Sequence, residues 1–389
     1  MIHFKNSLYR EFKRFSTDRS LLLLTVILPV LMAGAYLLLF SKGEIQDIPV
    51  AVCDNDKTTT SRQVVSMINA TPALKVSLDA RSMQQAHEAL QKGEVFAIVN
   101  IPEGMEKGVM GASGAQISAY VNGAYITNAT IALRDLTTVF QAFNIGAQSS
   151  ILTAKGVSPQ QSYDSAYPIV IQKHVLFNPL SSYSYYLLPG LMSMILVVII
   201  VLSTVYVVGS ELRYSTAPNW LETAGGNMSR AVITKLIPYF FIFVLILLFF
   251  NTALYRFLGL PMNANNFTVV IIGNLFFILS HMALGMILIT LLFNMRLAMS
   301  IGGGIAIASF SLSGLTFPHM GMYPFVEHLA QFVPFTHYMK LFIDSSMRGA
   351  PAIYGYDEIF FMSIFILIAF MLVPLLKKRC LNPKCFGKL

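Results

Sequence analysis

The segment that decides how this chain is organised is Ser210–Leu236, with the sequence SELRYSTAPNWLETAGGNMSRAVITKL. A strongly apolar run precedes it and another follows it, and each could cross the hydrocarbon core of a bilayer, which takes about 17–25 residues. The segment itself carries charges of both signs, Pro218 and the only tryptophan of the chain, Trp220. We therefore expect the chain to leave the membrane here and to re-enter it.

The composition places the whole chain in the membrane class. Of its 389 residues 55% are hydrophobic and only 12% are charged, whereas soluble proteins have about 25% charged residues. Six apolar runs are expected to span a bilayer: Leu21–Phe40, Leu187–Gly209, Pro238–Tyr255, Val269–Phe293, Leu297–Phe317 and Ile359–Leu376. No small-residue cleavage site follows the first run, so we interpret it as a retained signal anchor.

Lysines and arginines predict the orientation of these spans. If the N-terminus is cytoplasmic, the basic residues concentrate on inside segments close to the helix ends, and both termini are cytoplasmic. This accounts for the net charge of +8 without nucleic acid as a partner. Residues 377–389 form a basic cytoplasmic tail. Residues 1–20 are apolar at Leu8, Phe12 and Phe15 and basic elsewhere, which is typical of an interfacial amphipathic helix.

Residues 41–186 are polar and are expected to form a mixed α/β domain on the outside, inserted after the first span. The predicted strands are Ile48–Cys53, Val95–Ile101 and Gln116–Val121, and the predicted helices are Arg62–Ile68, Ser82–Gln91 and Thr127–Leu152. Cys53 is expected to be a buried strand residue. His87, Glu88 and Asp79 could act as acids or bases, but no motif surrounds them, so no catalytic role is expected.

The sequence offers no energy source and no cofactor site of its own. The only Gly-Lys pair, Gly387–Lys388, lacks the preceding glycine of a phosphate-binding loop. Cys380 and Cys385 have no further metal ligands near them in the sequence, so no metal site is predicted. None of the six predicted spans contains Asp or Glu, which argues against coupling to a proton or sodium gradient.

One ionisable residue does lie inside a predicted span. His281 is near the middle of the fourth run, and Asn274 lies seven residues earlier on about the same helix face. Two interpretations stay open: a polar lining of a substrate path, or a neutral imidazole that bonds to Ser280, Asn274 or nearby backbone.

Residues 210–236 are interpreted as a cytoplasmic coupling segment. Pro218 suits the first turn of a short helix, Thr216 could cap it, and Gly225-Gly226 ends it. Trp220 is either an aromatic anchor for a partner's socket or a tryptophan of an ordinary loop at headgroup depth.

The same segment resembles the region after the second span of ABC-2 type permeases, the membrane subunits of bacterial ABC exporters. The family pattern is roughly E-R-x-x-G-T-x-E-x-L-x-x-T-P followed by K-L-x-P-Y. It is matched here by Glu211, Arg213, Thr216, Leu221, Thr223, Lys235, Leu236, Pro238 and Tyr239. Ser215, Pro218 and Ala224 depart from it. The resemblance implies contact with an ATPase through Glu211, Arg213, Thr216, Trp220, Leu221 and Glu222.

A second match follows the fifth predicted span, in Ser313–Gly349. The family landmarks found here are Ser313, Gly314, Phe317, Pro318, Pro324, Pro334, Tyr338 and Gly349, with Tyr323 in place of a methionine; Asn178-Pro179 and Pro189-Gly190 match the approach to the second span. The resemblance implies a re-entrant outer hairpin over residues 318–349, whose amphipathic pieces are Phe325–Phe332 and His337–Ser345. Glu327, His328 and His337 would face an outward vestibule. A plain loop that caps the bundle is the alternative.

Small residues also mark one face of the fifth predicted span. Ser300, Gly304 and Ala308 are spaced four apart, and such faces let helices pack closely. In the resembling family the first and fifth spans form the dimer contact, which we expect here. Packing against the second or fourth span of the same chain is the alternative.

The predicted function is that of a permease subunit of an ABC exporter in the bacterial inner membrane. It would have no ATPase site, and ATP and Mg would bind a separate ATP-binding subunit. A second permease copy or a paralogue, membrane lipids and a periplasmic adaptor are the other expected partners, and the expected substrate is a small amphiphilic or lipid-like molecule. The alternative is a non-transporting membrane scaffold or receptor whose outside domain binds a partner.

Overall fold

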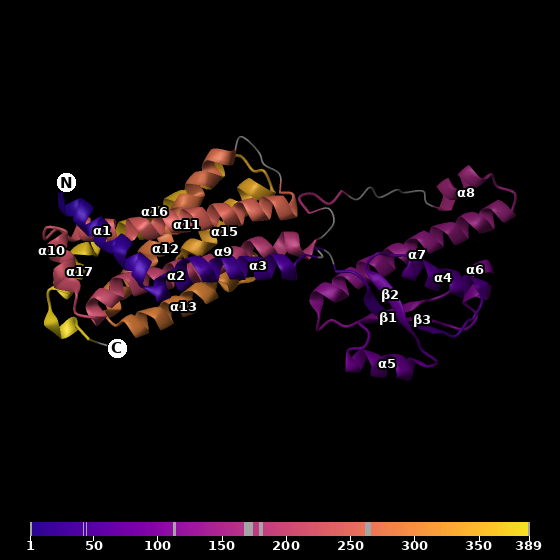
Figure 1. The fold of residues 1–389 in the computed structure, drawn as a ribbon. Helices are drawn as coiled ribbons and strands as arrows, with labels where there is room; N and C mark the ends of the chain where they lie inside the picture. Colours follow the sequence, from indigo (N-terminus) through magenta and orange to yellow (C-terminus); the bar gives the residue numbers. More distant parts are fainter. Residues whose placement is uncertain are drawn as a thin grey trace. The chain divides into compact units, whose positions relative to one another are not determined.

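The computed structural model describes residues 2–41, 43, 45–111, 114–166, 174–178, 182–260 and 266–387. Sequence predictions that concern Pro179 and Lys388 fall outside these residues. The chain divides into two compact units, one formed by Met1–Gly43 with Leu176–Leu389 and the other by Glu44–Val175. The first unit is a bundle of helices and the second is a small α/β domain (Figure 1).

Helices make up the first unit, which we call the bundle. They are α1 (Ile2–Thr17), α2 (Arg19–Leu22), η1 (Leu23–Ile27), α3 (Leu28–Leu39), α9 (Tyr183–Arg213), α10 (Ala217–Thr223), α11 (Met228–Leu258), α12 (Phe267–Leu292), α13 (Met295–Leu312), η3 (His319–Gly321), α14 (Pro324–Gln331), α15 (Pro334–Phe342), η4 (Ile343–Met347), α16 (Ile353–Met371), α17 (Val373–Cys380) and η5 (Pro383–Cys385). Among the described residues, six of these helical stretches are long and apolar enough to cross a membrane: α2 to α3, α9, α11, α12, α13, and α16 to α17. Each predicted span lies on one of them.

The ends of the spans differ from the prediction. The fifth span was expected to reach Phe317, but α13 ends at Leu312, because Gly314 adopts a left-handed φ of +80° that leaves the helix. The sixth begins at Ile353 and therefore contains Glu358, so the expectation that no acidic residue lies in a span is wrong. The same holds for Glu211, because α9 continues to Arg213.

The second span, α9, is the centre of the bundle and is buried along most of its length. Glycines let its neighbours approach it: a Cβ at Gly285 of α12 would lie 3.0 Å from the carbonyl oxygen of Val201, and one at Gly302 of α13 would lie 2.9 Å from the Val201 side chain. The predicted small face of α13 points the other way. Ser300, Gly304 and Ala308 are exposed, so they do not pack against α9 or α12.

Between α13 and α16 the chain forms a broken helical hairpin, as the prolines predict. Pro324 and Pro334 begin α14 and α15, where a missing N–H leaves no hydrogen bond unmade. The first predicted piece is close to α14. The second begins at Pro334 instead of His337, and it is buried except for Lys340, whereas α14 is largely exposed.

The second unit is a sheet between helices. The strands β1 (Ile48–Asp54), β2 (Leu74–Asp79), β3 (Ala97–Ile101) and β4 (Ser118–Val121) lie in the order β2-β1-β3-β4. Strand β1 is parallel to β2 and β3, and β4 is antiparallel to β3. The helices are α4 (Thr59–Asn69), α5 (Met83–Lys92), α6 (Met105–Met110), α7 (Ile126–Ala154) and α8 (Pro159–Ala166).

Two separate cores cover the two faces of this sheet. Val50, Val52 and Val99 belong to a core that also contains residues of α4 and α7. Ala51, Cys53 and Ile98 belong to the other, with residues of α5. The three predicted strands, the three predicted helices and the burial of Cys53 are confirmed. The prediction missed β2, because this edge strand alternates buried and exposed residues and has few apolar ones.

Asp56 holds the turn after β1 and yields a first prediction. Its carboxylate accepts hydrogen bonds from the Thr58 hydroxyl at 2.6 Å and from the backbone N–H groups of Gly104 at 2.8 Å and Glu106 at 3.1 Å. The hydrogen bond from Thr58, helped by these amides, holds the pKa of Asp56 below its usual value. We expect D56A to lower the opening free energy of the sheet by about 1–2 kcal/mol, which hydrogen exchange of the β1 and β3 amides would measure.

The lowered pKa fixes the pH dependence of this effect. The contribution of Asp56 is complete above its unfolded pKa of about 3.9 and is lost as the pH falls from there through the lower folded pKa. The difference between D56A and the parent protein should therefore shrink below about pH 4. Glu88 is exposed on α5, so E88A is the matched control. Equal exchange rates in D56A and E88A at neutral pH would contradict the assigned role.

Candidate functional site

Polar side chains from three parts of the chain meet at one end of the bundle. The N-terminal helix α1 packs against α10 and α11, next to the end of α9. Both ends of the described chain lie at this end of the bundle (Figure 1). We call the charged group formed there by Arg10, Glu11, Arg14, Glu211 and Lys235 the ion cluster.

Lys235 is the centre of the ion cluster. Its side chain is 0% exposed, and its Nζ lies 2.8 Å from Glu11 Oε2 and 2.7 Å from Glu211 Oε1. The side chains of both glutamates are only 2% exposed. A buried charge is tolerated only when it is paired and hydrogen-bonded. The three residues therefore tie α1, α9 and α11 together.

Two arginines of α1 complete the pairing. Arg10 donates from one guanidinium nitrogen, Nη2, to both carboxylate oxygens of Glu211 at 2.9 Å, and such charge-assisted hydrogen bonds are strong. Arg14 donates to Ser210 Oγ and, at 3.2 Å, to the carbonyl oxygen of Val207. The hydroxyl of Tyr239 donates to Glu11 at 3.0 Å. Each carboxylate thus receives several donors, and removing one partner would leave buried charge behind.

The role expected for Trp220 as an exposed anchor is wrong. Its side chain is 1% exposed, and its indole N–H donates to the carbonyl oxygen of Ala231 at 3.2 Å. Lys235 Nζ lies 4.9 Å from the ring centroid, close enough for a cation–π contact. The tryptophan is therefore the packed inner face of α10.

The helix α10 is otherwise built as predicted. It spans Ala217–Thr223, and Gly225 and Gly226 end it with φ of +69° and +72°. Asn227 then caps α11 by accepting from the N–H of Arg230 at 3.0 Å. Thr216 occupies the N-cap position as predicted, but its side chain makes no capping hydrogen bond, because its hydroxyl donates to Glu211 instead.

Of the six residues predicted to contact an ATPase, three are buried and three reach the surface to some extent. Glu211, Trp220 and Leu221 are buried, Arg213 and Thr216 are half-buried, and Glu222 is exposed. Three further exposed residues, from α10 and from the turn before it, lie near Glu222 in the sequence. We call Tyr214, Pro218, Asn219 and Glu222 the α10 surface.

The predicted hairpin motif shapes the chain after α13. Ser313 Oγ accepts from the N–H of Leu315, and a Cβ at Gly314 would lie 2.4 Å from the His319 ring. Pro318 precedes η3, and Phe317 is exposed. These residues, with Pro324 and Pro334 at the helix starts, set the turns of the hairpin.

His337 does not face a vestibule, contrary to the expectation. It is buried, with its Nδ1 2.6 Å from Glu358 Oε2 and its Nε2 2.9 Å from the carbonyl oxygen of Gln331. Its ring stacks on Phe361 at 4.8 Å between centroids. Lys340 donates to the other oxygen of Glu358, and this hydrogen bond raises the pKa of Lys340. The contacts fasten α15 to α16.

The other two residues named for the vestibule are at the surface: His328 is exposed and Glu327 is half-buried.

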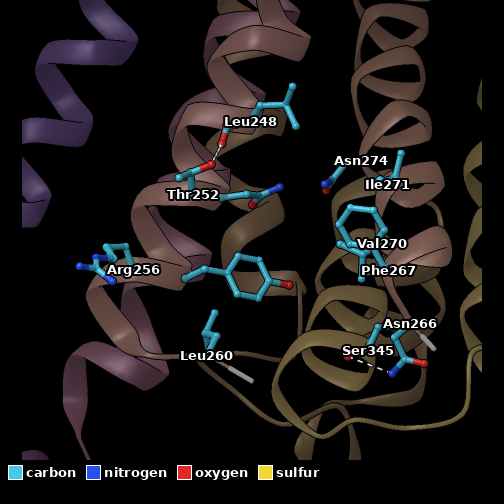
Figure 2. Close-up of a pocket in the computed structure, with 12 residues that line it drawn as sticks. Leu248, Thr252, Arg256, Leu260, Asn266, Phe267, Val270, Ile271, Asn274 and Ser345 are labelled. Atoms are coloured by element: carbon cyan, nitrogen blue, oxygen red, sulfur yellow. Dashed lines mark hydrogen bonds between the residues drawn. The ribbon is translucent and has the colours of Figure 1, made fainter. Parts of the chain in front are cut away.

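His281 and Asn274 do not share a cavity. His281 is buried, with its Nδ1 2.6 Å from the carbonyl oxygen of Phe277, which agrees with the packing interpretation. Asn274 accepts a hydrogen bond from the hydroxyl of Tyr338 at 3.1 Å and lines a pocket between α11 and α12 (Figure 2). Within the described part of the chain, no three His, Cys, Asp or Glu side chains are grouped to hold a metal ion.

The residues that sequence reasoning missed are Glu11 and Glu358. Glu11 is the only acidic residue of the otherwise basic helix α1, and this exception was a signal that it has a cationic partner. Glu358 lies one residue before the predicted start of the sixth span. In both cases the partner is brought by another helix.

The comparisons with known proteins agree on one family. The sequence profile described as "ABC-2 family transporter protein" matches residues 19–376. A curated relative from Escherichia coli K12, "Probable multidrug ABC transporter permease YbhS", is 21% identical over 337 residues, which are 85% of this chain and 85% of the relative. The protein of the same name from Escherichia coli O157:H7 matches equally. With this match over nearly the whole chain and six apolar helices, the chain belongs to the ABC-2 family of transporter permeases, the membrane components of ABC transporters, and is a multi-pass protein of the bacterial inner membrane.

Proposed function

We infer that the chain is the permease subunit of an ATP-driven exporter and that a separate ATP-binding subunit pushes on the α10 surface. The observation that carries this proposal is the ion cluster. Because Lys235 binds both Glu11 and Glu211, a displacement of α10 acts on α1, α9 and α11 together. Helix α10 is coupled to the cluster through Trp220 and Thr216. A short surface helix is thereby joined rigidly to two spans.

The distribution of basic residues supports a cytoplasmic position for this end of the bundle. Many lysines and arginines lie on elements that meet there or at the ends of adjacent spans: Lys5, Lys13, Arg19, Arg213, Arg230, Arg296, Lys377 and Lys378. Such residues favour the cytoplasmic side. Both termini are then cytoplasmic, and the inserted α/β domain between the first and second spans is extracytoplasmic.

The remaining partners follow from the same proposal. ATP and Mg bind the ATP-binding subunit, and this chain needs no cofactor. The exposed small face of Ser300, Gly304 and Ala308 is available to a second permease copy or a paralogue. The extracytoplasmic domain would hand cargo to a periplasmic adaptor.

The relative from Escherichia coli is named a probable multidrug transporter permease, which supports a small amphiphilic or lipid-like substrate moved out of the cytoplasm or the inner leaflet. Nothing in the comparisons favours the alternative of a non-transporting scaffold.

Charge reversal on the α10 surface tests the proposal. Glu222 is exposed, and its carboxylate forms no hydrogen bond or ion pair with a described residue, so E222R leaves the bundle intact. We expect E222R to weaken binding of the ATP-binding subunit at least tenfold, or about 1.4 kcal/mol, and to reduce the stimulated ATP hydrolysis in proportion. Co-purification and ATPase assays in proteoliposomes measure both.

The matched control is E88R, the same substitution at an exposed position of the inserted domain. E88R should leave both quantities unchanged. Melting temperatures of the two variants should equal that of the parent protein. If E222R bound and stimulated the ATP-binding subunit as E88R does, the α10 surface would not be the docking site. If the parent protein moved solute without any ATP-binding subunit, the proposed function itself would be wrong.

A further inference from the structure

A pocket of about 460 Å³ opens between α11 and α12, far from the ion cluster (Figure 2). Asn251 lies 16 positions after Lys235 on the same helix, or about 24 Å along its axis. The volume is within the range of about 300–1,000 Å³ that is typical of small-molecule sites. Its walls are formed by Leu248, Asn251, Thr252, Tyr255, Arg256, Leu260, Asn266, Phe267, Val270, Ile271, Asn274 and Ser345.

One amide group in this pocket needs a hydrogen-bond acceptor, and a second, half-buried amide can donate to one. Asn251 is only 7% exposed, and its side-chain nitrogen is buried with no hydrogen-bond partner among the residues that the structure describes. The side-chain oxygen of Asn274 accepts a hydrogen bond from Tyr338, and its side-chain nitrogen donates none to a described residue. An unpaired polar group in an apolar environment is costly. Asn251 therefore calls for an oxygen atom of a bound molecule, and Asn274 can donate to a second one.

Three other polar side chains of the pocket already donate hydrogen bonds within the protein. Asn266 donates to the carbonyl oxygens of Ser345 and Ala350, at 3.1 and 2.8 Å. Tyr255 donates to Ser346 at 2.8 Å, and Thr252 donates to the carbonyl oxygen of Leu248 at 2.8 Å. Among the described neutral side chains that line the pocket, the buried donor without an acceptor is thus the amide of Asn251.

A cation marks the open end of the same pocket. Arg256 is exposed, forms no ion pair with a described residue, and lies on the outer side of α11 in Figure 2. Arg256, Thr252 and Leu248 are four residues apart and so follow one another along one helix face, about 6 Å from one to the next. From the rim inward, the order is a cation, polar groups with the amide of Asn251, and an aliphatic wall.

We propose that this pocket binds one molecule of a glycerophospholipid-like amphiphile with an anionic head. The phosphate lies at Arg256, the ester oxygens accept from Asn251 and Asn274, and an acyl chain follows Leu248 and Ile271. The order of groups in such a molecule, phosphate then esters then chain, is the order of the pocket residues. A bilayer lipid and an exported lipid-like amphiphile share this chemistry. Lipid binding to this pocket requires no ATP-binding subunit. The binding proposal can therefore fail while the proposed function holds, and the reverse.

Lipid titration of the purified full-length protein in detergent, followed by native mass spectrometry, tests the proposal. We expect phosphatidylglycerol to bind with one tight site and to bind at least fivefold more tightly than phosphatidylethanolamine. N251L should weaken phosphatidylglycerol binding at least fivefold. R256Q should remove the preference for the anionic head. The control R296Q changes an exposed arginine outside the pocket in the same way and should bind as the parent protein does.

Melting curves distinguish a loss of lipid binding from a loss of folding stability. N251L removes an unpaired amide, so without lipid it should melt at the parent temperature or above, while the stabilisation by added lipid is reduced. Equal affinity in the parent protein, N251L and R256Q would overturn the proposal, and so would equally good competition by glycerol phosphate, which has no chains. A single-chain phospholipid that competes as well as phosphatidylglycerol would assign the pocket to an exported amphiphile. Preference for two chains would assign it to a bilayer lipid.

Discussion

K235M is expected to destabilise the bundle by about 3–5 kcal/mol, because it leaves two buried carboxylates without their shared cation. Glu11 would keep only the Tyr239 hydroxyl and a distant Arg14, at 3.7 Å. For a unit of this size the melting temperature should fall by roughly 10 °C. Thermal unfolding of the purified protein, followed by fluorescence of Trp220, measures the loss directly, since Lys235 lies against that ring.

Two further variants separate this charge effect from a simple loss of packing. K377M is the same substitution at an exposed lysine of α17, and it should shift the melting temperature by less than about 2 °C. The double variant E11Q/K235M removes one of the orphaned charges and should recover part of the lost stability. A K235M protein as stable as K377M would show that the ion cluster does not hold the helices together.

The spans and the short helix α10 could be predicted because local sequence determines them. Apolar runs of membrane length define the helices, and Pro218 with Gly225-Gly226 brackets α10 within one residue at each end. Whether Trp220 is exposed or buried could not be decided in the same way. A short amphipathic helix can turn its apolar face to a partner, to lipid or to its own bundle, and only the packing of α10 against α11 selects the last.

The ion cluster could not be predicted for a related reason. Lys235 pairs with Glu11, 224 positions away, and no local pattern joins an interfacial helix to the start of the third span. The resemblance to the permease family pointed to Glu211 and Lys235, but it gave Glu211 a surface role and Lys235 no role. Their burial follows from the length of α9 and α11, which extend beyond the apolar runs and carry both charges into the protein. The pairing of His337 with Glu358 could not be predicted either, because helix packing brings the two residues together across 21 positions.

E358L is expected to loosen the hairpin from the last span. It removes the acceptor of both His337 and Lys340, and His337 is too deeply buried for water to replace it. A buried donor left without a partner costs about 1–3 kcal/mol, and more when it is charged. We expect a loss of about 2–4 kcal/mol and a fall in melting temperature of roughly 5–10 °C. Hydrogen exchange should rise in α15 and α16 and stay unchanged in α10.

A double-mutant cycle decides whether the pair or the packing is responsible. H337L/E358L replaces both buried partners with apolar side chains, so it should be more stable than E358L alone. K340M removes the third member, whose side chain is 63% exposed, and should cost no more than about 1 kcal/mol. Because the two leucines fill space but form no hydrogen bond, recovery in the double variant would identify the orphaned imidazole as the source of the instability. Losses that simply add would instead mean that His337 and Glu358 contribute independently and that the hairpin is held by its apolar contacts.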